Sequence, residues 1–384
     1  MTTGLAIAAL AVWLYLLVAR GAFWRAGERD DRDVPAMPSA WPDIAAVVPA
    51  RDEAEVIATS LGSLLRQDYP GSLRVVLVDD QSQDGTAAAA RQAATDARAA
   101  DRLTIVSGRS PPAGWVGKVW AMQQGAEHVA SLAVAPRYLL FTDADIAYDT
   151  DALKPLVARA EAGGLALASL MVKLRCETWS ERAFVPAFVF FFQMLYPFAW
   201  VNRPDHPMGA AAGGCMLVRR EALEAAGGID AIRGALIDDC ALGQNLKSVG
   251  PTWLGLTERV HSLRAYPRVS DIRRMVARSA YTQLRRSPLL LAATIGGLAL
   301  SYLVPPLTAL LGTGVARALG VLAWAAMALA FQPTLRLYRL SPLWGLALPL
   351  IALAYMAFTL DSAYQHARGR GGLWKGRVAD VSMP

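Results

Sequence analysis

The sequence predicts an α/β domain built on a mostly parallel sheet with helices on both faces, joined to transmembrane helices near both ends of the chain. Three observations lead to this fold class. The 384 residues are 54% hydrophobic, with a positive mean hydropathy, which is too apolar for a purely soluble enzyme. Apolar stretches typical of strands alternate with helical patterns between residues 44 and 262. Longer apolar runs lie before and after that region.

Residues 1–24 are predicted to form a transmembrane anchor. Leu5 to Phe23 is apolar except for Arg20, which lies near the end, where its long side chain can reach the lipid headgroups. A cleaved signal peptide is the alternative, but the chain starts without positive charge and no small-x-small cleavage site follows. Residues 25–43 are charged and contain prolines, so we expect a linker there.

Residues 44–262 are predicted to form the α/β domain. Helices are expected between buried-type strands at 44–49, 74–79, 103–107 and 138–146. Asp84 is expected to cap the helix that follows the second strand. Strands that alternate with helices at this spacing form a largely parallel sheet, and ligands bind beyond the carboxyl ends of such strands.

Charged side chains follow three of the predicted strands at the point where each strand ends. Alternate residues of a strand face the same way, so Asp143 and Asp145 can hold one Mg2+ or Mn2+ between them. A solvated turn is the alternative for an isolated Asp-x-Asp, and the neighbouring clusters favour the metal site. No P-loop and no Gly-x-Gly-x-x-Gly follows the first strand, which disfavours a kinase or a dinucleotide oxidoreductase. The three clusters are Arg51-Asp52-Glu53, Asp79-Asp80 and Asp143-Ala144-Asp145.

Six motifs occur in a fixed order over roughly residues 44 to 260. They are VVPARDE (47–53), VVLVDDQSQDGT (75–86), GWVGKVWAMQQG (114–125), FTDADI (141–146), GGCMLVRREALEAAGG (213–228) and IDDCALGQNLKSVG (237–250). This series resembles glycosyltransferase family 2, the inverting GT-A type, and the conjunction is far more specific than any single motif. The arrangement is most similar to the hopene-associated membrane glycosyltransferases, with SLRAY at 262–266 and WKGR at 374–377.

The resemblance implies an activity and a role for several residues. The activity is transfer of a sugar from a nucleotide-diphosphate donor, expected to be a UDP-sugar, with Mg2+ or Mn2+ as the cofactor. Lys118 is expected near the donor, Asp143 near the ribose and metal, and Asp145 as the metal ligand. The uridine pocket would be lined by Pro49, Ala50, Arg51 and Glu53, with Asp80 or its neighbour Asp79 in contact with the base.

Asp239 is expected to be the general base that removes the proton from the acceptor hydroxyl. It begins a segment with helical spacing, where the helix dipole favours the ionised carboxylate. The family often has Glu-Asp here, so Asp238 is a shortened variant and is kept as an accessory residue. The alternative is that both residues only stabilise the first turn of the helix.

The Gln-x-x-Arg-Trp motif of processive family members is absent, since MVARSAYTQLRR occupies residues 275–286. This argues against a polymer synthase. It also leaves the residues that clamp the donor diphosphate unassigned, with Arg274, Arg278 and Gln283 as candidates.

Histidine and cysteine residues add few further candidates. His206 could approach the acceptor and His261 could be a third metal ligand, with a solvated and a structural histidine as the respective alternatives. The three cysteines have no metal-site spacing and are odd in number, which fits a reducing compartment; they are Cys176, Cys215 and Cys240.

The remaining segments predict how the chain meets a membrane. Residues 183–201 are aromatic-rich but interrupted by prolines, so we expect an interfacial or re-entrant element, with a buried core helix as the alternative. Residues 263–287 are predicted to form a basic amphipathic helix at the membrane surface, or else a solvated basic helix. Residues 288–362 contain three apolar runs, of which two are expected to span, and residues 363–384 form a basic tail.

The charge distribution predicts location and partners. The net charge is +6, and basic clusters at 264–286 and 368–377 flank apolar segments without an aromatic-basic recognition motif. We therefore expect a multi-pass protein of the bacterial inner membrane with a cytoplasmic catalytic domain and no nucleic-acid partner. The expected acceptor is a lipid hydroxyl of the hopanoid type. A polyprenyl-phosphate or glycerolipid acceptor is the alternative, and a non-catalytic scaffold of a lipid pathway is the rival from another class.

Overall fold

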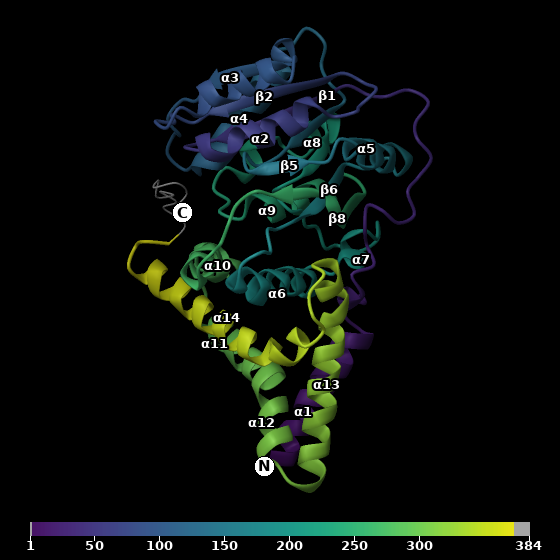
Figure 1. Ribbon diagram of the computed structural model, residues 1–384, viewed down its shortest axis with the longest axis vertical. Helices are drawn as coiled ribbons and strands as arrows, with labels where there is room; N and C mark the ends of the chain where they lie inside the picture. Colours follow the sequence, from purple (N-terminus) through teal and green to yellow (C-terminus); the bar gives the residue numbers. More distant parts are fainter. Residues whose placement is uncertain (1, 372–384) are drawn as a thin grey trace. The chain divides into compact units, whose positions relative to one another are not determined.

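The computed structural model describes residues 2–371, which separate into two compact units (Figure 1). The sheet unit comprises residues 28–175 and 200–264, and the helical unit comprises residues 2–27, 176–199 and 265–371. Most of the predicted basic tail at 363–384, including the WKGR motif, lies outside the described residues.

The sheet unit is built on one eight-stranded sheet of order β3-β2-β1-β4-β7-β6-β8-β5. The first three pairings along this order are parallel, and β7 is antiparallel to both β4 and β6. Strand β8 is parallel to β6 and antiparallel to β5. The predicted α/β class is confirmed, and its sheet is mixed beyond β4. The strands are β1 Ile44–Ala50, β2 Leu73–Asp79, β3 Leu103–Ser107, β4 Tyr138–Phe141, β5 Ile146–Tyr148, β6 Leu167–Lys173, β7 Met216–Arg219 and β8 Thr252–Ser262.

Helices cover both faces of the sheet, which explains the continuous apolar run of β1. All seven residues of β1 are buried. Ile44, Ala46 and Val48 face one core cluster, whereas Ala45 and Val47 face the other. A strand packed on both faces needs apolar residues at every position rather than at every second one. The helices of this unit are α2 Ala54–Leu65, α3 Thr86–Asp96, α4 Gly117–Ala130, α5 Leu153–Ala162, α8 Arg220–Ala225 and α9 Asp238–Lys247.

The segment predicted as a linker at 25–43 packs onto the sheet unit in part. Arg29 forms an isolated parallel bridge with Leu256 of β8. Asp30 is buried and accepts a 2.6 Å hydrogen bond from the Thr257 hydroxyl. The charged composition predicted a linker here, and composition does not reveal the hydroxyl that hydrogen-bonds the buried Asp30.

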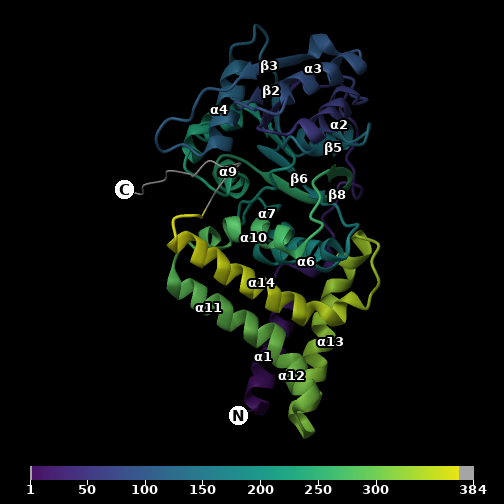
Figure 2. The ribbon, with the colours of Figure 1, turned by 60° about the vertical axis from the view of Figure 1, so that its left-hand side comes forward.

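The helical unit assembles segments from three separate parts of the chain. Helix α1 packs against α12 and α13, and α10 packs against α14 (Figures 1 and 2). Figure 2 shows α11 and α14 running side by side. The helices are α1 Thr2–Val18, α6 Trp179–Leu195, α10 Val269–Gln283, α11 Pro288–Leu298, α12 Val304–Leu311, α13 Gly314–Leu337 and α14 Trp344–Ala367, with a π-helix at Ala299–Leu303. A short helix, α7 Phe198–Val201, lies where the chain passes from this unit to the other.

Within residues 2–371, four helical stretches are long and apolar enough to cross a membrane. Three of them fill the region predicted to hold three apolar runs, and the fourth contains the aromatic-rich segment. Helix α1 has 17 residues and is shorter than these four. The stretches are Trp179–Val201, Pro288–Leu311, Gly314–Leu337 and Trp344–Ala367.

A tryptophan of α1 satisfies a backbone group that a proline leaves without its helical partner. Pro305 has no N–H to donate to the carbonyl of Ser301 four residues earlier. The indole N–H of Trp13 donates to that carbonyl instead, at 2.7 Å in a buried position. An unpaired carbonyl in an apolar surrounding costs several kcal/mol, so this bond explains why α1 is held at the π-helix.

We expect Trp13→Phe to lower the free energy of unfolding by about 1–3 kcal/mol, because the Ser301 carbonyl loses its donor. The measurement is the midpoint of thermal unfolding in detergent. Trp324→Phe is the matched control, since the Trp324 indole donates at 3.2 Å to Leu346 in an exposed position. Equal midpoint shifts in the two variants would contradict a special role for Trp13.

Candidate active site

The carboxyl ends of β1, β2 and β4 lie next to each other, because these strands are parallel neighbours in the sheet. The charged residues that follow them are therefore brought to one edge, as the sequence predicted. Arg51 makes the first link, since its Nη1 donates to the backbone carbonyl of Asp80 at 2.6 Å. The same nitrogen lies 3.7 Å from a carboxylate oxygen of Asp80.

Two residues with left-handed backbone lock the loops after β1 and β2 together. Asp52 has φ 51° and Gln81 has φ 59°. The N–H of Asp52 donates to the Ser82 hydroxyl at 3.0 Å, and the N–H of Gln83 donates to the Asp52 carboxylate at 2.9 Å. Such strained conformations persist only where surrounding contacts compensate them, and they gather at functional sites.

Asp84 does not cap its helix in the predicted way. The N-cap of α3 is Gly85, with φ 90°, and its geometry places Asp84 one residue further out. Asp84 accepts hydrogen bonds from the N–H of Thr86 at 3.0 Å and from the N–H of Ala54 at 2.9 Å. One carboxylate thus serves the first residues of both α2 and α3, which fixes the start of the two helices relative to each other.

Lys118 is the centre of a second cluster. Its Nζ lies 2.8 Å from Oδ1 of Asp143 and 2.9 Å from Oδ2 of Asp238. Lys118 lies in the first turn of α4, and the N-cap residue of that helix, Val116, donates its N–H to the carbonyl of Arg233 at 2.8 Å. The lysine therefore connects the loop after β4 with the first turn of α9.

Asp239 is held by two backbone N–H groups. Its Oδ2 accepts from Gly213 at 2.9 Å and its Oδ1 accepts from Cys240 at 2.7 Å. Burial and the adjacent charge of Asp238 nevertheless raise the pKa of Asp239 to about 6, against the opposing effects of Lys118 and the two N–H donors. The helix-dipole argument from the sequence gave the opposite direction, because it did not include burial.

The cluster carries more negative than positive charge. Burial raises the pKa of Asp143; Lys118 opposes this rise, and the charges of Asp145 and Asp238 add to it. Burial opposes the charge of Lys118, but Asp143 and Asp238 outweigh that effect and raise the pKa of the ammonium group. An additional cation would relieve the repulsion among the carboxylates of Asp143, Asp145 and Asp238.

Asp143 and Asp145 fit a hard divalent cation in ligand type. Among residues 2–371, no three His, Cys, Asp or Glu side chains gather into a metal-binding group. Two carboxylates are nevertheless enough where the ion keeps waters and binds substrate phosphates, as Mg2+ does. The excess negative charge around Asp143 supports the same assignment.

Arg264 is a site residue that the sequence prediction missed. Its Nε lies 2.8 Å from Oδ2 of Asp145, and its Nη2 lies 2.8 Å from Oε1 of Glu53. Arg264 follows the end of β8 by two residues, so its position after a strand was the available signal. It was grouped instead with the basic residues of the following helix.

The other predicted residues are placed as follows. The structure does not group His261 with the carboxylates, because it lies within β8, where it pairs with Ala147 of β5, and no metal group forms among the described residues. His206 stacks on Trp200, with ring centroids 5.0 Å apart, and its Nδ1 accepts from the N–H of Met208. Arg278 is exposed on α10 of the helical unit.

The ends of β1 and β2 hold the remaining predicted residues. Pro49 and Ala50 are the last two residues of β1. Asp79 is half-buried, and its carboxylate accepts from the N–H of Ser82 at 3.0 Å. Asp80 is completely buried, so Asp79 is the more accessible of the two candidates for contact with a base.

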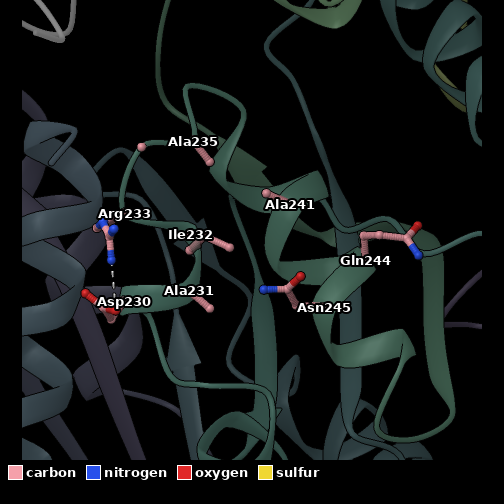
Figure 3. Close-up of a pocket in the computed structure, with 9 residues that line it drawn as sticks. Asp230, Ala231, Ile232, Arg233, Ala235, Ala241, Gln244 and Asn245 are labelled. Atoms are coloured by element: carbon pink, nitrogen blue, oxygen red, sulfur yellow. Dashed lines mark hydrogen bonds and ion pairs between the residues drawn. The ribbon is translucent and has the colours of Figure 1, made fainter. Parts of the chain in front are cut away.

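A shallow cavity of about 500 Å³ lies between α9 and the loop that precedes it (Figure 3). Its lining includes Ala241, Gln244 and Asn245 of α9, while Asp230 and Arg233 form an ion pair at 3.3 Å on the loop. The cavity is next to the helix that begins with the acidic pair, but its lining does not include the Lys118 cluster.

Together the mixed sheet and the carboxylates at its strand ends define a GT-A-like α/β domain. Residues 45–227 match the model of Glycosyl transferase family 2, so the sheet unit carries a domain of that family. This confirms the predicted family for the domain; the hopene-associated subgroup stays a prediction. A search of curated protein sequences gives no match.

Three solved structures are similar to this chain, and the first of them, with a TM-score above 0.5, supports the fold class. The mannosyltransferase PcManGT from Pyrobaculum calidifontis, in complex with GDP-Man and Mn2+, has a TM-score of 0.55 at 21% identity, covering 96% of this chain and 99% of that chain. Mannosyl-3-phosphoglycerate synthase from Rubrobacter xylanophilus has a TM-score of 0.39 at 15% identity, covering 72% of this chain and 83% of that one. S. aureus TarS 1-349 in complex with UDP has a TM-score of 0.40 at 16% identity, covering 85% and 92%.

We expect Lys118→Met to lower the free energy of unfolding by about 2 kcal/mol at neutral pH, because it leaves the Asp143 and Asp238 carboxylates without their shared cation. The loss should shrink as the pH falls, because burial raises the pKa of Asp143 and this carboxylate then takes up a proton. The measurement is chemical denaturation of the purified protein at several pH values.

Lys154→Met is the control for Lys118→Met, since the Asp68 partner of Lys154 is 71% exposed. An exposed pair contributes at most about 1 kcal/mol. A pH-independent loss in Lys118→Met would show that the lysine stabilises the protein by packing rather than by charge.

Proposed function

We propose that this protein is a membrane-bound, inverting, metal-dependent glycosyltransferase that moves a sugar from a nucleotide-diphosphate donor to a lipid hydroxyl. The observation that carries the proposal is the Lys118 cluster. The Nζ of Lys118 lies within 2.9 Å of a carboxylate oxygen of Asp143, which is a candidate metal ligand, and of one of Asp238. Asp238 is next to the candidate base, Asp239. A donor group and a proton acceptor are needed side by side for a single displacement.

The donor would bind at the ends of β1 and β2. Arg51 and Glu53 come from the first loop, and the half-buried Asp79 is positioned to accept hydrogen bonds from a base or a ribose. The donor is expected to be a UDP-sugar, as in the sequence prediction. The similar Pyrobaculum calidifontis structure contains GDP-Man, so a guanosine donor belongs in the same test.

The reaction would be a single displacement at the anomeric carbon. The acceptor oxygen forms a bond to that carbon, the bond to the nucleoside diphosphate breaks with inversion, and Asp239 takes the hydroxyl proton. A divalent cation held by Asp143 and Asp145 would neutralise the charge that develops on the leaving diphosphate. Two backbone N–H groups keep Asp239 oriented.

The membrane segments support a lipid as the acceptor. Four helical stretches among residues 2–371 have the length and composition of membrane spans. On α10, Ile272 and Val276 are buried while Arg278 is exposed, so the helix keeps a basic side chain on its exposed face. We propose a hopanoid-type acceptor at the bacterial inner membrane with a cytoplasmic sheet unit; a polyprenyl-phosphate or glycerolipid acceptor is the second candidate.

We expect Asp239→Asn to reduce sugar transfer by roughly 10²- to 10⁴-fold, because the amide cannot take the proton. Binding of the nucleoside diphosphate with Mn2+ should change little, since the Asp239 carboxylate accepts its hydrogen bonds from the backbone N–H groups of Gly213 and Cys240. Lipids from cells that express either form, compared by mass spectrometry, should show a glycolipid only with the wild type. Donor hydrolysis by the purified protein separates the enzyme from a scaffold, which would give none.

A second test is the pH dependence of transfer. Asp239 must be ionised to act as a base, and its pKa is raised to about 6. Hence kcat/KM should rise with pH through about 6 and then level off. Steady-state kinetics between pH 5 and 8 measure this, and a flat profile over that range would contradict the assignment of Asp239 as the base.

A further inference from the structure

Arg264 is fixed at the carboxylate cluster by its own backbone. The preceding residue, Leu263, donates its N–H to the carbonyl of Asp145 at 2.8 Å. The N–H of Arg264 donates to the Ser262 hydroxyl at 3.2 Å, and that hydroxyl lies 3.4 Å from the Asp145 carboxylate. The end of β8 is thus bonded to the loop that carries the metal candidates, which holds the guanidinium at that loop.

The guanidinium bridges two carboxylates that come from different strands. It pairs with Asp145 after β4 and with Glu53 after β1, each at 2.8 Å. The two carboxylate side chains are about one tenth exposed, whereas that of Arg264 is 37% exposed. The arginine therefore faces two nearly buried anions while part of its side chain remains open to solvent.

This pairing competes with a metal at Asp145. A divalent cation on that carboxylate would place two positive groups on one anion, and they repel each other. The diphosphate of a donor would arrive with the cation and would offer the arginine another anion. A planar guanidinium matches phosphate oxygens in a bidentate arrangement better than a lysine does.

We propose that Arg264 exchanges partners during donor binding: it occupies the Asp145 carboxylate in the donor-free protein and binds the donor diphosphate once a cation takes that carboxylate. Glu53 keeps the guanidinium in reach throughout. The inference rests on the proposed function. It assigns the diphosphate clamp to Arg264, whereas the candidates from the sequence, Arg274, Arg278 and Gln283, lie in α10.

The test uses the full chain in detergent and two variants, Arg264→Ala and Arg264→Gln. Binding of Mn2+ alone is followed by electron paramagnetic resonance, and binding of UDP, GDP and the corresponding monophosphates with Mn2+ by calorimetry. Both variants should bind Mn2+ alone more tightly than the wild type, because the competing cation is gone. They should bind the diphosphates roughly 10- to 100-fold more weakly, which is the usual effect of losing a charged hydrogen-bonding partner. The affinity for the monophosphates should stay within about twofold of the wild-type value, because they lack the second phosphate that Arg264 is proposed to bind.

Arg259→Ala is the matched control. Arg259 lies in β8, five residues before Arg264, and pairs with Asp30 at 3.5 Å and with Asp151 at 3.3 Å, so its loss removes the same charge from a nearby position. Arg259→Ala should leave the affinities for Mn2+ alone, for the diphosphates and for the monophosphates unchanged. Thermal unfolding of each variant verifies that the chain is folded.

The outcomes separate the exchange from the proposed function. If the wild type binds diphosphates with Mn2+ but the Arg264 variants bind Mn2+ no more tightly, the exchange is refuted and the function stands. Weaker Mn2+ binding in these variants would likewise show a merely structural ion pair. If the wild type binds neither diphosphate, the proposed function fails and the exchange with it.

Discussion

The ion pairs of Lys118 are the constraint on which the site depends. The lysine comes from α4, and its two partners follow β4 and begin α9. The start of α9 lies more than a hundred residues after the start of α4, and the fold of the sheet unit brings both next to the loop that follows β4. The side chains of Lys118 and Asp238 are less than one fifth exposed, and leaving either charge without its partner would be far more costly than the pair is stabilising. The loops that carry the chemistry are therefore held in place by charge as well as by packing.

The sequence was informative where local physics decides the structure. The apolar run of β1 predicted a strand covered on both faces, and both core clusters contain its residues. The acidic residues at 79–80 and 143–145 could be placed at one edge because parallel strands end together. The family match covers residues 45–227, which include the first four motifs, from 47–53 to 141–146.

The sequence was less informative where partners come from distant segments. The positions of β7 and β8 on either side of β6 follow from tertiary packing, since a short strand such as Met216–Arg219 carries little periodic signal. Arg264 was missed because its neighbours in sequence are basic, while its partners lie 119 and 211 residues earlier. The direction of the Asp239 pKa could not be predicted, because a helix-end argument contains no term for burial.

The bond between Trp13 and Ser301 also bears on the order in which the chain folds. These residues are 288 positions apart, and the segments of the sheet unit lie between them. During synthesis, which adds about 5–20 residues per second, α1 leaves the ribosome long before its partners α12 and α13 exist. Helix α1 therefore has no α12 or α13 to pack against while residues 28–264 are synthesised. The sheet unit can therefore fold before α1 packs against α12 and α13.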